Sequence, residues 1–224
     1  MKGQNRSAKS LCRRAPSISP RQSVLIVCEG ARTEPEYFRS LRKELRLQTV
    51  EVVVEGERCG SAPISVVDHA ISLRSEREAE AKQSAIAVPY DVIWCVMDVE
   101  APKPHVSLAA ALDKAKANGL DVALSNPTFE YWYLLHFEKT SALMQSNKVL
   151  MKKLKKHHSK YKKNDPGFFE VVYPRTAEAI KNSKSVLKEK HYGDDLRDCN
   201  PSTHVHCVVE HLQGIAARPP CAAR

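Results

Sequence analysis

The chain has 224 residues, of which 42% are hydrophobic and 27% are charged, and its formal net charge is +9. This is the composition of an ordinary soluble globular protein, with enough residues for one sizeable α/β domain or two small ones. No apolar run approaches the ~20 residues that a transmembrane helix needs, and the N-terminus lacks the apolar region of a secretory signal, so the composition excludes both segments.

The positive charge is concentrated in two segments. Residues 1–21 carry six Lys or Arg and no acid, and residues 148–163 carry eight Lys and no acid, which leaves a mildly acidic remainder. We interpret residues 1–22 as a disordered basic arm. Basic patches of this kind suit contact with a phosphate backbone, although the lysine segment is equally well explained as a solvated helix face.

The seven cysteines show no C-x-x-C pair and no regular spacing. A zinc site or a disulfide framework needs paired spacing, so the sequence predicts a cytoplasmic protein in a reducing compartment. Cys28 and Cys95 lie in apolar strand patterns, where a thiol behaves as a small core residue.

Strand and helix patterns alternate through the first part of the chain. Apolar and β-branched runs predict four strands, at residues 23–28, 49–55, 90–97 and 120–125. Helical periodicity predicts helices at residues 34–47, 62–82, 106–119 and 128–137. Thr33 is a candidate N-cap for the first of these helices. The order predicts a Rossmann-like parallel sheet of about four strands flanked by helices, over residues 23–140.

The remainder of the chain reads as helical. Helix patterns occur near residues 145–158, 174–190 and 201–216, and no strand is predicted beyond residue 140. We therefore expect residues 141–216 to form a helical appendage packed on the sheet, followed by a tail at 217–224. Ser202 or Thr203 is expected to supply the capping oxygen of the last helix.

Acidic residues follow two of the predicted strands. Glu29 follows the first strand, and Asp98 and Glu100 follow the third. Because ligands bind at the carboxyl ends of parallel strands, these three carboxylates are expected to share one crevice if the two strands are neighbours. An all-oxygen ligand set suits Mg²⁺ or Mn²⁺, so the same three residues are the predicted metal ligands and catalytic groups.

Further side chains are candidates for the same site. Glu34 and Glu130 each lie in the first turn of a predicted helix that follows a strand, but each is equally well explained as an acid that complements the helix dipole. Asn126, which precedes Pro127, is more simply explained as part of a turn. The sequence lacks G-x-x-x-x-G-K-[ST], a G-x-G-x-x-G after the first strand, and G-x-S-x-G, which removes much of the support for nucleotide hydrolysis and hydride transfer.

Four motifs in order resemble those of RloB-like proteins. They are 26-IVCEGARTEPEYF-38, 93-IWCVMDVE-100, 124-LSNPTFEYWYLLHF-137 and 200-NPSTHVHCVVEHL-212. The resemblance implies a Toprim-like domain, in which Glu29 takes the place of the Toprim glutamate and Asp98 and Glu100 that of the D-x-D pair. Two departures are Glu100, where aspartate is usual, and His105, which stands offset from the family histidine.

The resemblance also implies a role in anti-phage abortive infection, commonly beside an ATPase partner. The resulting hypothesis is a metal-dependent nuclease that acts on DNA or RNA. A homo-oligomer is a candidate form of the protein, and no contact with a membrane is expected. The alternative is a non-catalytic nucleic-acid-binding or regulatory subunit of such a system. In both cases the candidate phosphate contacts are lysines of the basic segment: Lys152, Lys153, Lys155, Lys156, Lys160, Lys162 and Lys163.

Overall fold

A computed structural model describes residues 22–54, 62–84, 86–100, 102–165, 167–190 and 199–217, without the side chains of residues 52–54. The predicted basic arm, apart from Gln22, and the predicted tail, apart from Ala217, lie outside these residues.

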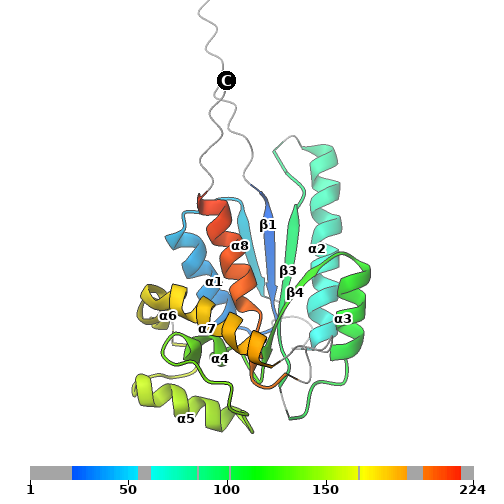
Figure 1. Cartoon of the computed structure of the whole chain (residues 1–224). Coiled ribbons are helices and arrows are strands. Elements are labelled where there is room, and N and C mark those ends of the chain that lie inside the picture. Colours follow the sequence, from blue (N-terminus) through cyan, green and yellow to red (C-terminus); the bar gives the residue numbers. More distant parts are fainter. Residues whose placement is uncertain are drawn as a thin grey trace, which may run out of the picture.

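The centre of the molecule is one five-stranded sheet (Figure 1). Its strands are β1 (Val24–Cys28), β2 (Val50–Val54), β3 (Val92–Asp98), β4 (Asp121–Asn126) and β5 (Ser202–Thr203), in the order β2-β1-β3-β4-β5. The first four are parallel, and β5 is antiparallel to β4. The predicted α/β class and the four predicted strands are confirmed.

The fifth strand corrects the expectation that no strand occurs beyond residue 140. Ser202 pairs with Asn126 and Thr203 pairs with Ser125, so the C-terminal part of the chain completes one edge of the sheet. The hydroxyls of Ser125 and Thr203 lie 3.0 Å apart. Oγ1 of Thr203 also accepts a hydrogen bond of 3.2 Å from the backbone N–H of Val205, where the last helix begins, which confirms the expected capping oxygen.

Eight α-helices and one 3₁₀ turn are present in the described part of the chain. They are α1 (Thr33–Glu44), α2 (Pro63–Gln83), α3 (Leu108–Ala117), α4 (Glu130–Leu135), α5 (Asn147–His157), α6 (Phe168–Val172), η1 (Tyr173–Arg175), α7 (Thr176–Glu189) and α8 (Val205–Ala217). The expectation for Thr33 is wrong, because the N-cap of α1 is Arg32 and no side chain caps that helix. The Thr33 hydroxyl instead donates to Asn164 Oδ1 at 2.9 Å.

Helices cover both faces of the sheet (Figure 1). Because side chains alternate along a strand, Leu25 and Val27 pack in one core with residues of α2 and α3. Val24 and Ile26 face the other core, which contains residues of α1, α4 and α8. Both faces of β1 are therefore buried, which explains its uninterrupted apolar run. Cys28 and Cys95 are fully buried in these cores, as predicted.

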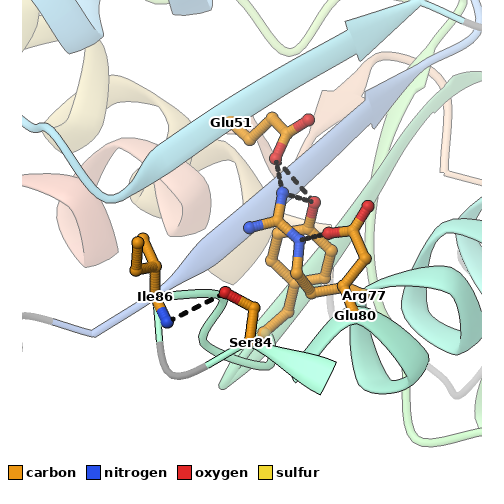
Figure 2. Close-up of polar contacts among 6 residues, drawn as sticks. Glu51, Arg77, Glu80, Ser84 and Ile86 are labelled. Atoms are coloured by element: carbon orange, nitrogen blue, oxygen red, sulfur yellow. Dashed lines mark hydrogen bonds and ion pairs between the residues drawn. The ribbon is translucent and has the colours of Figure 1, made fainter. Parts of the chain in front are cut away.

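The amino ends of the strands are held together by a polar network (Figure 2). Arg77 of α2 lies 2.7 Å from Glu51 Oε2 of β2, and the hydroxyl of Tyr90 donates to the same oxygen at 2.6 Å. Arg77 also lies 3.4 Å from Glu80 Oε2. This edge is opposite the carboxyl ends of the strands, so Arg77 fixes α2 to the sheet away from the predicted site. No described helix has the length and apolarity needed to cross a membrane.

Candidate carboxylate site

Glu29 is held at the carboxyl end of β3. Strands β1 and β3 are neighbours in the sheet, and Cys28 at the end of β1 pairs with Val96 of β3. The backbone N–H of Glu29 donates to the carbonyl of Val96 at 3.0 Å, and Glu29 Oε2 accepts from the backbone N–H of Asp98, also at 3.0 Å. The first and third strands thus place their terminal acids next to each other, as the sequence predicted.

A cavity of about 320 Å³ opens at this edge. Five carboxylates and two cations line it, together with four small or polar residues: Glu29, Glu34, Asp98, Glu100, Glu130, Arg32, Lys163, Gly30, Ala31, Thr33 and Asn164. All three predicted catalytic residues are therefore brought to one cavity. Glu34 and Glu130 also line this cavity, although the helix dipole alone could have explained their positions in the sequence.

Glu34 folds back over the β1–α1 loop. A Cβ atom at Gly30 would lie only 2.1 Å from Glu34 Oε2, so only glycine leaves space for the carboxylate in this position. The Glu34 residue is 7% exposed although it belongs to the first turn of α1. A purely dipole-related acid has no reason to be buried, so its placement favours a role in the cavity.

Glu130 begins α4 and is 1% exposed. Its Oε2 accepts a hydrogen bond of 2.6 Å from the Thr128 hydroxyl. Its Oε1 has no hydrogen-bond partner within the described residues and lies 3.9 Å from Nζ of Lys163. A buried carboxylate oxygen that lacks a hydrogen bond is costly, so this atom is available to a ligand with positive charge.

Two residues of the cavity wall have left-handed backbone conformations. The φ angle of Glu100 is +58° and that of Asn164 is +66°. Glu100 therefore does not continue the extended strand, which ends at Asp98, yet it still lines the cavity as an exposed side chain. Such conformations cost free energy in residues other than glycine and are enriched at functional sites.

Burial and mutual repulsion raise the pKa values of three acids. Burial raises the pKa of Glu29 to about 7, and the nearby charges of Glu100 and Glu34 also raise it. The hydrogen bond from the backbone N–H of Asp98 lowers this pKa but does not outweigh the other causes. Burial also raises the pKa of Glu34 to about 7, helped by Glu130. The pKa of Asp98 is raised well above its usual value by burial and by the carboxylates of Glu34, Glu130 and Glu29.

The donor chemistry of the cavity fits a divalent cation. Carboxylate oxygens are the preferred ligands of Mg²⁺ and Mn²⁺, and a cation would relieve the repulsion that raises these pKa values. Among the residues that the structure describes, no three His, Cys, Asp or Glu side chains are arranged as a ready-made metal site. Binding of a cation therefore requires a side chain to turn, and the exposed Glu100 has the freedom to do so.

Two further candidates do not line the cavity. His105 is exposed and lies next to Ser107, with 2.8 Å between its Nδ1 and the serine hydroxyl. Asn126 is fully buried at the end of β4 and precedes a cis peptide bond to Pro127, consistent with the turn that the sequence indicated.

The predicted lysine contacts separate into two groups. Lys163 lines the cavity, and Lys153 forms an ion pair of 3.3 Å with Glu138. The others are exposed and do not line the cavity: Lys152, Lys155, Lys156, Lys160 and Lys162. Sequence reasoning missed Arg32 and Asn164 as cavity residues. For Arg32, its position between Glu29 and Glu34 was an available signal, whereas the long loop that carries Asn164 gave none.

The model of the family described as RloB-like protein matches residues 24–212. The chain belongs to the RloB-like protein family. The match in this RloB-like chain extends from β1 into α8 and includes all five cavity carboxylates. No curated protein and no solved structure matches the chain.

Proposed function

We propose that this RloB-like chain is a metal-dependent nuclease that cleaves phosphodiester bonds in DNA or RNA. The observation that carries the proposal is the hydrogen bond between Glu29 and the backbone of Asp98, which joins two strand-end acids in a cavity with three further carboxylates. Parallel α/β sheets bind ligands at this edge. The placement of the two acids also supports a Toprim-like assignment of the sheet.

The roles of the residues follow from their surroundings. Asp98, Glu29 and Glu100 would hold the cation, and a bound Mg²⁺ would stabilise the charge that develops on the scissile phosphate. A carboxyl group with a pKa of about 7, such as Glu29, can also accept or release a proton at neutral pH. Lys163, at the cavity wall, would neutralise a phosphate oxygen.

The wider setting of the proposal comes from the family. RloB-like proteins are associated with anti-phage abortive infection and with an ATPase partner, and we propose both for this chain, acting in the cytoplasm. The exposed lysines of α5 and of the loop that follows it are the proposed contacts to the nucleic-acid backbone. Such contacts give affinity without sequence selection.

One observation favours the alternative of a non-catalytic nucleic-acid-binding or regulatory subunit. Glu29 Oε2 already accepts a backbone hydrogen bond, and the carboxylate of Glu34 is folded against Gly30. Two of the five cavity acids are thus engaged within the protein, which leaves fewer carboxylate oxygens for a cation.

Cleavage assays distinguish these functions. Plasmid DNA, single-stranded DNA, total RNA and tRNA are incubated with the protein in Mg²⁺, Mn²⁺ or EDTA, with and without the proposed ATPase partner. We expect metal-dependent cleavage that Asp98→Asn abolishes and that Asp113→Asn retains. Asp113 is a matched control because it is an exposed aspartate on α3. Cleavage that persists in Asp98→Asn would exclude this site as the active site.

A further inference from the structure

The carboxylate cavity continues into two further hollows along α1. The second hollow, of about 290 Å³, shares Ala31, Arg32, Thr33 and Asn164 with the carboxylate cavity. The third hollow, of about 350 Å³, shares Arg39 with the second. The carboxylate cavity and the two hollows thus lie next to one another in a row, which we call the α1 groove, from the ends of β1 and β3 to the far end of the helix.

The charge changes sign along the α1 groove. Its first part is the carboxylate cavity, and the second hollow is lined by both signs, with Glu36 and Asp165 beside Arg32 and Arg39. Four of the six residues that line the third hollow are cations, namely Arg39, Arg42, Lys43 and Arg46, and none is an acid. Arg32, Arg39 and Lys43 follow the spacing of one helix face, and Arg46 lies just past the end of α1, whose last residue is Glu44.

These cations are available to a ligand. Arg32, Arg39, Lys43 and Arg46 are exposed, and none forms an ion pair within the part of the chain that the structure describes. Arg42 is different, because its Nε donates to the carbonyl of Leu47 at 3.1 Å. An unpaired row of exposed cations is the usual signature of a phosphate-binding surface.

We propose that the α1 groove binds the backbone of a nucleic-acid strand whose reacting phosphate lies in the carboxylate cavity. This inference rests on the proposed function. The 12 residues of α1 extend over about 18 Å, which corresponds to about five nucleotides of one strand of a duplex. Arg39 and Lys43 contact its phosphates. The α1 groove is thus a binding surface separate from the lysines of α5.

The shape of the α1 groove favours a nucleic acid over an acidic protein. Its basic part opens into a cavity whose acids would repel an acidic peptide but fit a cation-bound phosphate.

The test is a binding measurement in EDTA, where cleavage does not interfere. Fluorescence anisotropy follows a labelled 20-nucleotide single-stranded DNA and the same sequence in RNA, as salt is varied. We compare Arg39→Gln/Lys43→Gln with Lys82→Gln/Lys116→Gln, which removes the same charge from exposed positions on α2 and α3. Far-UV circular dichroism checks that each variant is folded.

We expect the α1 variant to bind at least one probe about tenfold more weakly or worse near 0.1 M salt, with a salt slope lower by about 1.4, since each contact to a single strand contributes ~0.7. The control should stay within about twofold of the unmodified protein. Four results would overturn the inference: no binding of either probe by the unmodified protein, unchanged binding in the α1 variant, equal loss in both variants, or displacement of the probe by polyglutamate as readily as by unlabelled nucleic acid.

The binding test of the α1 groove and the cleavage test of the proposed function can fail independently of each other. Loss of binding in Arg39→Gln/Lys43→Gln supports the α1 groove even if no cleavage is found. Unchanged binding in that variant, together with cleavage that depends on Asp98, would overturn the α1 groove and leave the nuclease in place.

Discussion

Replacing Glu34 by glutamine is expected to stabilise the protein above neutral pH. The pKa of Glu34 is raised from 4.5 to about 7, so the folded state binds its proton more tightly than the unfolded state. Stability therefore falls as pH rises from about 4.5 to about 7, and the full cost is present above that range. At ~1.4 kcal/mol per pKa unit the cost is about 3 kcal/mol at pH 8.

Glutamine has nearly the same shape and carries no charge, so it removes this cost. It also removes a favourable helix-dipole interaction of ~0.3–1 kcal/mol, which leaves a net gain of about 2 kcal/mol at pH 8. At pH 5 the Glu34 side chain is already protonated in the folded state, and the gain should be below ~1 kcal/mol.

The assay is urea unfolding in EDTA at pH 8 and pH 5, followed by far-UV circular dichroism. Glu36→Gln is the matched control, because it is an acid of the same first turn of α1 that does not line the carboxylate cavity. The control should lose ~0.3–1 kcal/mol at pH 8 through the helix dipole. If Glu34→Gln is no more stable than Glu36→Gln at pH 8, the carboxylate of Glu34 is not buried among like charges.

Three further outcomes test the site and the scaffold. Mg²⁺ at 100 times its dissociation constant should stabilise the protein by ~2.7 kcal/mol, which is seen as a higher melting temperature. Asp98→Asn should lose most of this effect. An equal shift in the variant and the unmodified protein would place the cation elsewhere. Gly30→Ala should fold but displace the Glu34 carboxylate, because the new Cβ would lie 2.1 Å from Glu34 Oε2, so cleavage should fall while the melting temperature changes little. Arg77→Met should lower the free energy of unfolding by ~1 kcal/mol through the lost contact with Glu51 and leave cleavage unchanged. Loss of cleavage in a folded variant would mean that the polar network at the amino ends of the strands influences the site at their carboxyl ends.

The parallel strands and the first acids of the site follow from local patterns. Buried parallel strands read as short apolar runs, and the end of each run fixes where its next residue lies. That is why the neighbourhood of Glu29 and Asp98 was predictable once β1 and β3 were taken as neighbours. The positions of Glu34 and Glu130 were ambiguous, because the first turn of a helix favours acids for reasons unrelated to a site.

The remaining features depend on contacts between distant segments. β5 has only two residues, too few for any alternation to show, and its pairing is set by where α7 and α8 bring the chain. Asn164 reaches the cavity through a hydrogen bond with Thr33, which is 131 positions away in the chain. The α1 groove was overlooked because its cations alternate with the acids and apolar residues of an amphipathic helix, whereas the lysines of the basic segment are contiguous.

The late position of β5 also bears on how the protein is made. Its pairing partner, β4, is complete at Asn126, but Ser202 and Thr203 are translated roughly 4–15 s later at ~5–20 residues per second. During that interval the nascent sheet has an open edge beside the turn that leads to Glu130. Because residues of α8 then complete the core that also contains α4, we expect the carboxylate cavity to reach its final form only after the ribosome has added these last elements. If the chain is the proposed nuclease, its site is completed late in its synthesis.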